Sequence, residues 1–298
     1  MSNKEFYILP FDHRNAFLEL VADTSLEPDE TARHKVARLK WLVYQGFLQA
    51  VAQGLPKTAG VVLADEEFSA AVLSDALSKK IPVCLGVEKH NVVEFALAYG
   101  DSWLEHVNKW RPAIVKALVK YNPADDLISK ERQLVSLKKV ADACAAQGYQ
   151  FMLEPLVPAT AEQLALCQGD VAIYERDLRP ALSLKMIEEF YQASVRPDIW
   201  KVEGYQELEH YRSLLGLVNK LGGEDVSTIM LGRAQAWDKV AEQLRLAARA
   251  GLNGFAVGRT VFAEPLFNYI KDGNQTAAVA AIAQNFYLLY EIFKQARP

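Results

Sequence analysis

The fold is decided by the stretch Phe6-Tyr7-Ile8-Leu9-Pro10-Phe11-Asp12-His13-Arg14, near the start of the 298-residue chain. Its first part, 6–11, is a compact apolar run, which predicts a buried strand. A doubly wound sheet usually places a glycine-rich turn after its first strand, whereas an aspartate, a histidine and an arginine follow here. The stretch therefore favours another arrangement of parallel strands, with charged residues at the strand ends.

Further apolar runs of the same kind follow along the chain. Most are short and continuous, which is typical of parallel strands that are covered on both faces. Together with the first run, the expected strands are Phe6–Phe11, Gly60–Ala64, Pro82–Val87, Ile114–Tyr121, Gln150–Leu156, Ile199–Glu203, Ser227–Leu231 and Gly254–Val257.

Segments with the apolar spacing of helices separate these strands. Helices are expected over 36–51, 134–144, 240–248 and 277–293, and glycine ends the first three. Eight strand–helix units in about 300 residues match the size of a TIM (β/α)8 barrel. No repeat, low-complexity tract or linker divides the sequence, so we predict a single α/β domain over 1–298. The segment Ala277–Phe293 either caps the barrel or joins subunits, and both remain open.

The composition excludes several classes of protein. Apolar residues make up 51% of the chain and charged residues 23%, a balance that excludes a disordered or fibrous chain. A net charge of -4 gives no broad electrostatic attraction to nucleic acid or to an anionic membrane. No uncharged apolar run reaches the roughly 18 residues of a membrane span. Cys84, Cys144 and Cys167 are too scattered for a disulfide framework, and the amino terminus lacks a signal-peptide profile. These features predict a cytoplasmic protein that binds small anions at a local site and that can form a homo-oligomer.

Charged residues gather at the predicted strand ends, where TIM barrels carry their functional groups. Because burying a lone charge is costly, we expect these residues to share one polar cluster at the mouth of the barrel. In chain order they are Asp12, Asp65, Glu88, Lys116, Glu154, Lys201, Glu203, Gly232-Arg233 and Gly258-Arg259.

The lysines in this set carry the most information. Lys201 lies inside the short apolar strand 199–203, and strand periodicity places Glu203 on the same face. An ion pair between the two is therefore one interpretation. The other is a desolvated amine that attacks a carbonyl and forms a Schiff base. Because Lys116 and Glu154 also lie inside apolar runs, the functional interpretation is favoured.

Two Gly-Arg pairs follow the last two strands. Gly258-Arg259 stands at a predicted helix start, where backbone amides, close approach at glycine and a guanidinium group together suit a phosphate. Gly232-Arg233 is a weaker version of this feature. The alternative is a plain turn with a solvated arginine.

Other motifs are missing from the sequence. The histidines show no metal-binding spacing, so neither a metal nor a cofactor is expected. Trp103, Trp110 and Tyr121 are expected to pack in the core and rim, and Arg176–Arg179 is expected to be a loop.

Taken together, these motifs resemble the class I (Schiff-base) aldolases of the tagatose-1,6-bisphosphate and sulfofructose-phosphate type. The sequence is still more similar to the aldolase-like domain of bacterial inositol catabolism, found alone or fused to a sugar kinase. That domain is associated with 5-dehydro-2-deoxyphosphogluconate aldolase activity, with dihydroxyacetone phosphate and malonate semialdehyde as products. The resemblance runs from Phe11-Asp12-His13-Arg14 to Val257-Gly258-Arg259-Thr260.

The resemblance implies a role for each matching residue. The Lys-Val-Glu motif of strand 6 makes Lys201 the Schiff-base lysine, and the Leu-Glu motif of strand 5 makes Glu154 the proton-transfer group. Lys116 and Asp12 would hold the reacting oxygens. The implied substrate and phosphate contacts are Gly258, Arg259, Gly232, Arg233, Arg14 and Asp65.

The sequence departs from the tagatose type at two places. Leu231-Gly232-Arg233 stands where those enzymes carry a serine, and His13 stands where they carry glutamine or a similar residue. Tagatose-bisphosphate and sulfofructose-phosphate aldolases remain alternatives, as does a non-catalytic barrel that binds a sugar phosphate. A zinc-type aldolase is disfavoured because the histidine cluster is missing.

Overall fold

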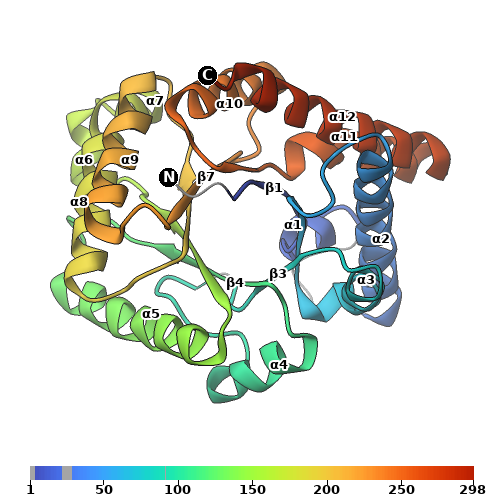
Figure 1. Ribbon diagram of the computed structural model, residues 1–298, viewed down its shortest axis with the longest axis horizontal. Helices are drawn as coiled ribbons and strands as arrows, with labels where there is room; N and C mark the ends of the chain where they lie inside the picture. Colours follow the sequence, from blue (N-terminus) through green and yellow to red (C-terminus); the bar gives the residue numbers. More distant parts are fainter. Residues whose placement is uncertain (1–3, 22–28, 91) are drawn as a thin grey trace.

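The computed structural model describes residues 4–21, 29–90 and 92–298. Eight parallel strands follow one another around a closed barrel, and β8 pairs with β1 to complete it (Figure 1). This is the expected TIM barrel. The strands are β1 (Phe6–Pro10), β2 (Gly60–Ala64), β3 (Val83–Gly86), β4 (Ile114–Lys120), β5 (Gln150–Leu156), β6 (Ile199–Glu203), β7 (Ser227–Leu231) and β8 (Gly254–Ala256).

Helices form a ring outside the strands, as Figure 1 shows. The longer ones are α2 (Glu30–Ala52), α3 (Glu66–Ser78), α4 (Trp103–Trp110), α5 (Leu127–Gln147), α8 (Arg179–Gln192), α9 (Leu208–Gly222), α10 (Trp237–Ala250), α11 (Arg259–Asp272) and α12 (Gln275–Ala296). Short helical turns complete the ring: α1 (Asn15–Leu18), η1 (Gly100–Ser102), α6 (Ala161–Leu166), α7 (Val171–Ile173) and the π-helical η2 (Tyr174–Leu178).

The predicted strands are confirmed, and four have the expected bounds. The other four end one residue earlier, because apolar composition continues past the last paired residue, and β3 also begins one residue later. One prediction is wrong. Arg176–Arg179 is not a loop, since η2 covers most of it and α8 begins at Arg179. The segment lacks an apolar period that would reveal a helix, although Pro180 in the first turn is typical of a helix start.

Strand periodicity divides the buried side chains into two layers. Ile8, Leu63, Met152, Ile199 and further apolar residues fill the inside of the barrel. Their neighbours along each strand pack outward against the helices. Because side chains alternate, the residue two positions after an interior one also points inward. Lys201 follows Ile199 in this way, and its side chain is therefore directed into the barrel near its carboxyl end.

Helix α12 packs in the outer ring against α2, α10 and α11. Its contact with α2 is close, since a Cβ atom at Gly46 would lie 2.4 Å from Ile282 Cγ2. Within the described residues, α12 is long and apolar enough to cross a membrane by length and composition. Ile282, Phe286, Leu289 and Phe293 are nevertheless buried in the main core. The expected helix 277–293 is thus part of the barrel's outer layer.

Candidate active site

A buried lysine holds the carboxyl ends of four strands together. Lys116, on β4, is 2% exposed. Its Nζ atom lies 3.0 Å from Asp12 Oδ2, 2.5 Å from Glu88 Oε1 and 2.8 Å from Glu154 Oε2. An ammonium group has three N–H donors, and these three carboxylates match that number. We call this set the Lys116 cluster: Lys116, Asp12, Glu88 and Glu154.

A second lysine shares one of these carboxylates. Lys201, on β6, is 4% exposed, and its Nζ atom lies 2.8 Å from Glu154 Oε1. The two oxygens of Glu154 therefore face the two lysines. The structure brings together the four residues to which the sequence assigned chemistry: Asp12, Lys116, Glu154 and Lys201. The alternative pairing of Lys201 with Glu203 is not the one observed, since Glu203 binds arginine instead.

The electrostatics of the cluster follow from this packing. Burial by itself raises the pKa of the Asp12 carboxyl, but Lys116 outweighs it, and the net pKa lies below the usual range. Lys116 and Lys201 together lower the pKa of Glu154 against the same effect of burial. Burial disfavours the charge of Lys116, yet its three carboxylates raise its pKa well above the usual value. Asp12, Glu154 and Lys116 are therefore charged at neutral pH in the site without substrate.

An open cavity of about 360 Å³ lies at the carboxyl ends of the strands, next to Glu154. Glu154 and Lys201 are in its wall, whereas Lys116 and Asp12 are not. Lys201 therefore lines the cavity, whereas Lys116 lies outside its wall. The other charged or potentially charged side chains of the wall are His13, Arg233 and Arg259.

The wall also contains the two glycines that were expected to contact phosphate, Gly232 and Gly258. Gly258 precedes α11, and a Cβ atom there would lie 2.3 Å from the Pro10 carbonyl oxygen, so no side chain fits. The first turn of a helix leaves N–H groups without partners inside the helix. The start of α11 thus offers amide donors and the Arg259 guanidinium beside the same cavity.

The two arginines of the wall differ in their partners. Arg233 Nη1 lies 2.5 Å from Glu175 Oε1 and 2.8 Å from Glu203 Oε1. In the part of the chain that the structure describes, no carboxylate lies within ion-pair distance of Arg259, and this side chain is exposed. Arg259 is therefore the guanidinium available to an anion in the cavity, while Arg233 is already neutralised.

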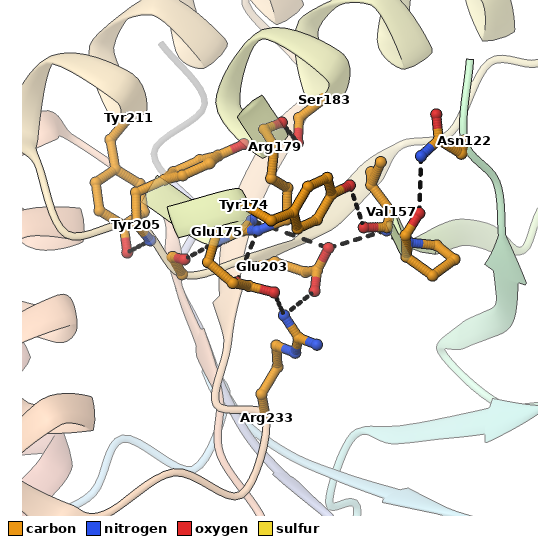
Figure 2. Close-up of polar contacts among 12 residues, drawn as sticks. Asn122, Val157, Tyr174, Glu175, Arg179, Ser183, Glu203, Tyr205, Tyr211 and Arg233 are labelled. Carbon is orange, nitrogen blue, oxygen red and sulfur yellow. Dashed lines mark hydrogen bonds and ion pairs between the residues drawn. The ribbon is translucent and has the colours of Figure 1, made fainter. Parts of the chain in front are cut away.

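Figure 2 shows the network that holds Arg233. Arg179 donates from Nε to Glu175 Oε2 over 2.9 Å and from Nη2 to the Gly204 carbonyl over 2.7 Å. The Val157 N–H donates to Glu203 over 3.0 Å. Burial raises the pKa of Glu203 above its usual value, although Arg179 and Arg233 lower it. The network joins η2, β6 and the loop after β7 at the rim of the barrel.

Two expected substrate contacts lie away from the cavity wall. Asp65 forms a buried ion pair with Lys40 and accepts a hydrogen bond of 2.8 Å from the Phe68 N–H at the start of α3. Arg14 lies 3.1 Å from Glu67. In this structure Asp65 and Arg14 thus tie the first helices to the strands.

Several residues of the site and its supports were not assigned a role from the sequence. Glu88 was recognised only as a charged strand end. The buried position of Lys40 could have been recognised from the sequence, because it lies four residues after Val36 on the apolar face of the predicted helix. In the structure Lys40 is fully buried. No sequence signal indicated a role for Glu175 and Arg179, since no motif relates them to Glu203, which is distant along the chain.

The expected absence of a metal rested on histidine spacing. Among the described residues, no group of three or more His, Cys, Asp or Glu side chains is arranged to hold a metal ion. The three clustered carboxylates surround the ammonium group of Lys116 instead.

Comparisons with known proteins give a family and a fold. Residues 1–297 match the family model described as "Uncharacterized protein conserved in bacteria (DUF2090)". No curated protein matches the sequence.

Solved aldolase structures have the same fold. An archaeal fructose-1,6-bisphosphate aldolase, whose catalytic lysine is covalently bound to the carbinolamine intermediate, has 12% identity and a TM-score of 0.56, over 96% of this chain and 95% of that one. The fructose-bisphosphate aldolase of Slackia heliotrinireducens has 12% identity and a TM-score of 0.58, over 98% and 86%. The YdjI aldolase of Escherichia coli K12 has 11% identity and a TM-score of 0.56, over 98% and 92%. At these identities the likeness establishes the TIM-barrel fold.

Proposed function

The chain belongs to the DUF2090 family of uncharacterized proteins conserved in bacteria, and we propose that this member is a class I aldolase. It would cleave a phosphorylated keto sugar or keto sugar acid through a Schiff base on Lys201. One observation carries the proposal: Lys201 is buried and lines the cavity, and its Nζ atom lies 2.8 Å from the Glu154 carboxylate. A lysine in this setting has a proton acceptor at hand and an opening through which a carbonyl can approach.

The geometry supports the following sequence of steps. Lys201 transfers a proton to Glu154, and its free amine attacks the substrate ketone. The resulting carbinolamine loses water and becomes an iminium ion, with Glu154 returning the proton to the leaving oxygen. Glu154, again a carboxylate, then takes the proton of the substrate hydroxyl, the adjacent carbon–carbon bond breaks, and the electron pair moves into the iminium to give an enamine and an aldehyde. Protonation of the enamine carbon and hydrolysis release the ketone product and restore Lys201.

Lys116 would support these steps without contacting the substrate. Its ammonium group already faces three carboxylates, so it fixes Glu154 beside Lys201 and does not donate to a reacting oxygen. Gly258, Arg259 and the start of α11 would bind the phosphate. Remote binding energy would then orient the reacting bond at Lys201.

The proposed substrate is 5-dehydro-2-deoxyphosphogluconate, cleaved to dihydroxyacetone phosphate and malonate semialdehyde. The sequence resemblance to the aldolase-like domain of inositol catabolism supports it. Tagatose bisphosphate and sulfofructose phosphate are the alternative substrates, and the two departures at His13 and Leu231-Gly232-Arg233 argue against the tagatose type.

Borohydride trapping tests the proposal. The protein is incubated with dihydroxyacetone phosphate, reduced with sodium borohydride and mapped by peptide mass spectrometry. An adduct on Lys201 is the expected result. An adduct on Lys116 would contradict the assigned roles. No adduct with this triose or with a panel of keto acids would favour the non-catalytic sugar-phosphate barrel.

The Glu154→Gln variant is expected to separate imine formation from cleavage. Glutamine keeps the size of the side chain but cannot move a proton, so we expect the cleavage rate to fall by about 10²- to 10⁴-fold. Lys201 should still be trapped by borohydride, although more slowly. Single-turnover cleavage and trapping are measured in parallel, and an unchanged cleavage rate would exclude Glu154 as the proton-transfer group.

The Arg259→Gln variant is expected to weaken phosphate binding. Because Arg259 has no carboxylate partner in the described chain, its charge is available to the substrate, and we expect KM to rise by about 10- to 100-fold. Trapping of unphosphorylated dihydroxyacetone should not change. Arg233→Gln is the matched control, since Arg233 is already paired with two carboxylates. An equal rise of KM in both variants would refute the distinction between the two arginines.

A further inference from the structure

One guanidinium group in the cavity wall is held by two carboxylates. Arg233 lines the cavity together with Arg259, and its side chain is 39% exposed. Its Nη1 atom lies 2.5 Å from Glu175 Oε1 and 2.8 Å from Glu203 Oε1. Figure 2 shows that both contacts end on this one nitrogen atom. Two carboxylates therefore face a single guanidinium group beside the proposed phosphate site.

The π-helical turn η2 fixes Glu175 in this position. The preceding residue, Tyr174, donates from its hydroxyl group to the Val157 carbonyl over 2.9 Å, which ties η2 to the loop after β5. Arg179 donates from Nε to Glu175 Oε2 over 2.9 Å. Glu175 thus uses one oxygen for Arg179 and the other for Arg233. π-Helical turns often occur at functional sites, and this turn carries a residue that neutralises Arg233.

Arg179 is placed to serve as a second cation for Glu203. Its Nη1 atom is buried without a hydrogen-bond partner among the described residues and lies 3.9 Å from Glu203 Oε2. Glu203 is buried, so a lone charge there would be costly. A movement of about 1 Å would bring the two groups within hydrogen-bond distance. Arg233 can therefore turn to a ligand without leaving Glu203 unpaired.

The four charges of this network cancel one another. Arg179 and Arg233 contribute two positive charges, and Glu175 and Glu203 contribute two negative ones. Arg259 consequently supplies the net positive charge of this part of the wall. Replacing one of the carboxylates with a neutral amide would leave a net charge of +1 in the network, next to the cavity.

We propose that Glu175 is a positioning residue that masks the charge of Arg233 and thereby weakens the binding of phosphorylated ligands in the cavity. The inference rests on the proposed function only for the phosphate site at Arg259 and the start of α11. Arg233 is a reserve anion contact, which becomes available when η2 withdraws Glu175. The affinity of the site for phosphate is therefore controlled by η2 as well as by the residues that line the cavity.

The Glu175→Gln variant tests the proposal by a gain of affinity. Glutamine has nearly the same size, and its oxygen can still accept from Arg179, but it carries no charge. The probe is glycerol 3-phosphate at about pH 8, where its phosphate group is doubly charged. In calorimetric titrations we expect the Kd of the variant to be about 3- to 10-fold lower than that of the wild type. An unchanged or higher Kd would overturn the proposal.

Two further variants attribute the gain to Arg233. Adding Arg233→Gln to Glu175→Gln should abolish the gain, and a gain that persists in the double variant would overturn the role of Arg233. Asp177→Asn is the matched control for charge. Asp177 also lies on η2, but it is 46% exposed and pairs with Arg176 at 2.6 Å. We expect its Kd to change by less than about 1.5-fold. A gain equal to that of Glu175→Gln would mean that general charge, and not masking, controls the affinity.

The binding measurement separates this inference from the aldolase function, because glycerol 3-phosphate has no carbonyl group. If Lys201 is not trapped by dihydroxyacetone phosphate but Glu175→Gln binds more tightly, the aldolase function fails and the masking stands. If Lys201 is trapped and Glu175→Gln shows no gain, the masking fails and the aldolase function stands. Binding to neither the wild type nor the variant also overturns the masking.

A second variant keeps the test decisive if Glu175→Gln does not fold, which thermal unfolding shows. Glu203→Gln removes the other carboxylate of Arg233, and its amide oxygen can still accept from the Val157 N–H. It should lower the Kd for glycerol 3-phosphate in the same direction. A folded Glu203→Gln variant with an unchanged or higher Kd would overturn the proposal.

Discussion

The Lys201→Met variant is expected to form no imine and to lose carbon–carbon cleavage by on the order of 10⁴-fold or more, as is typical when a covalent nucleophile is removed. The reason is geometric. In the described chain Lys201 is the lysine that lines the cavity, and its Nζ atom lies 2.8 Å from Glu154. Cleavage of the phosphorylated substrate and borohydride trapping are the measurements.

The fold of this variant should survive, which makes its activity interpretable. Glu154 keeps the second cation, Lys116, at 2.8 Å, so the substitution does not leave a lone buried carboxylate. Binding of glycerol 3-phosphate should therefore remain. Lys201→Arg is the matched control, because arginine keeps the positive charge next to Glu154 but forms no imine. Residual cleavage close to wild type in either variant would refute Schiff-base catalysis at this position.

The Lys116→Met variant is expected to be the least stable of the variants considered. The wild-type Lys116 side chain is 2% exposed and neutralises three carboxylates, Asp12, Glu88 and Glu154, all of which are also almost fully buried. Removing one partner of a buried charge cluster costs about 3–5 kcal/mol of folding free energy. Urea denaturation at pH 7 measures the loss.

The pH dependence of this loss distinguishes charge from packing. In the folded wild type the pKa values of Asp12 and Glu154 lie below their ordinary values. The stability that these two groups contribute is therefore fully present above their ordinary pKa. It is lost only as the pH falls through the lower pKa values of the folded state. Without Lys116, burial raises both pKa values in the folded state. The folded variant then binds protons more readily than the unfolded chain and gains stability as the pH falls. The gap between wild type and variant should therefore narrow from pH 7 to pH 4.

Two controls accompany this measurement. Lys109→Met removes an exposed lysine that pairs with Glu66 at 2.8 Å, and we expect it to cost about 1 kcal/mol or less. Adding Glu88→Gln to Lys116→Met removes one of the repelling charges and should restore part of the stability at pH 7. A loss that is the same at pH 7 and pH 4 would mean that lost packing, and not unpaired charge, destabilises the variant.

Much of the barrel could be predicted because its signals are local. A short apolar run that is followed by polar residues predicts a strand wherever it occurs. The observed bounds of β2, β5, β6 and β7 agree with the apolar runs. The shared face of Ile199 and Lys201 also follows from period two alone. The segment 176–179 was wrongly predicted to be a loop, because η2 and the start of α8 lack an apolar period.

The residues of the candidate site could be predicted from the sequence, but the contacts between them could not. Asp12, Lys116, Glu154 and Lys201 were singled out because each interrupts or follows an apolar run, and a buried charge needs a partner. The same argument could not tell which partner. It left an ion pair of Lys201 with Glu203 as one interpretation. The family resemblance assigned Asp65 and Arg14 to the substrate, whereas the structure pairs these two with Lys40 and Glu67.

The spacing of neighbouring residues is enough to predict that eight apolar strands alternate with helices and that charged side chains stand at the strand ends. Tertiary structure alone decided which charges meet. Lys116 and Asp12 are 104 positions apart and lie 3.0 Å apart in space. It also decided that Arg233 is neutralised while Arg259 remains available. The strength of an ion pair depends on the distance between the charges in space and not on their separation along the chain. Which ion pairs form is therefore decided when the barrel closes.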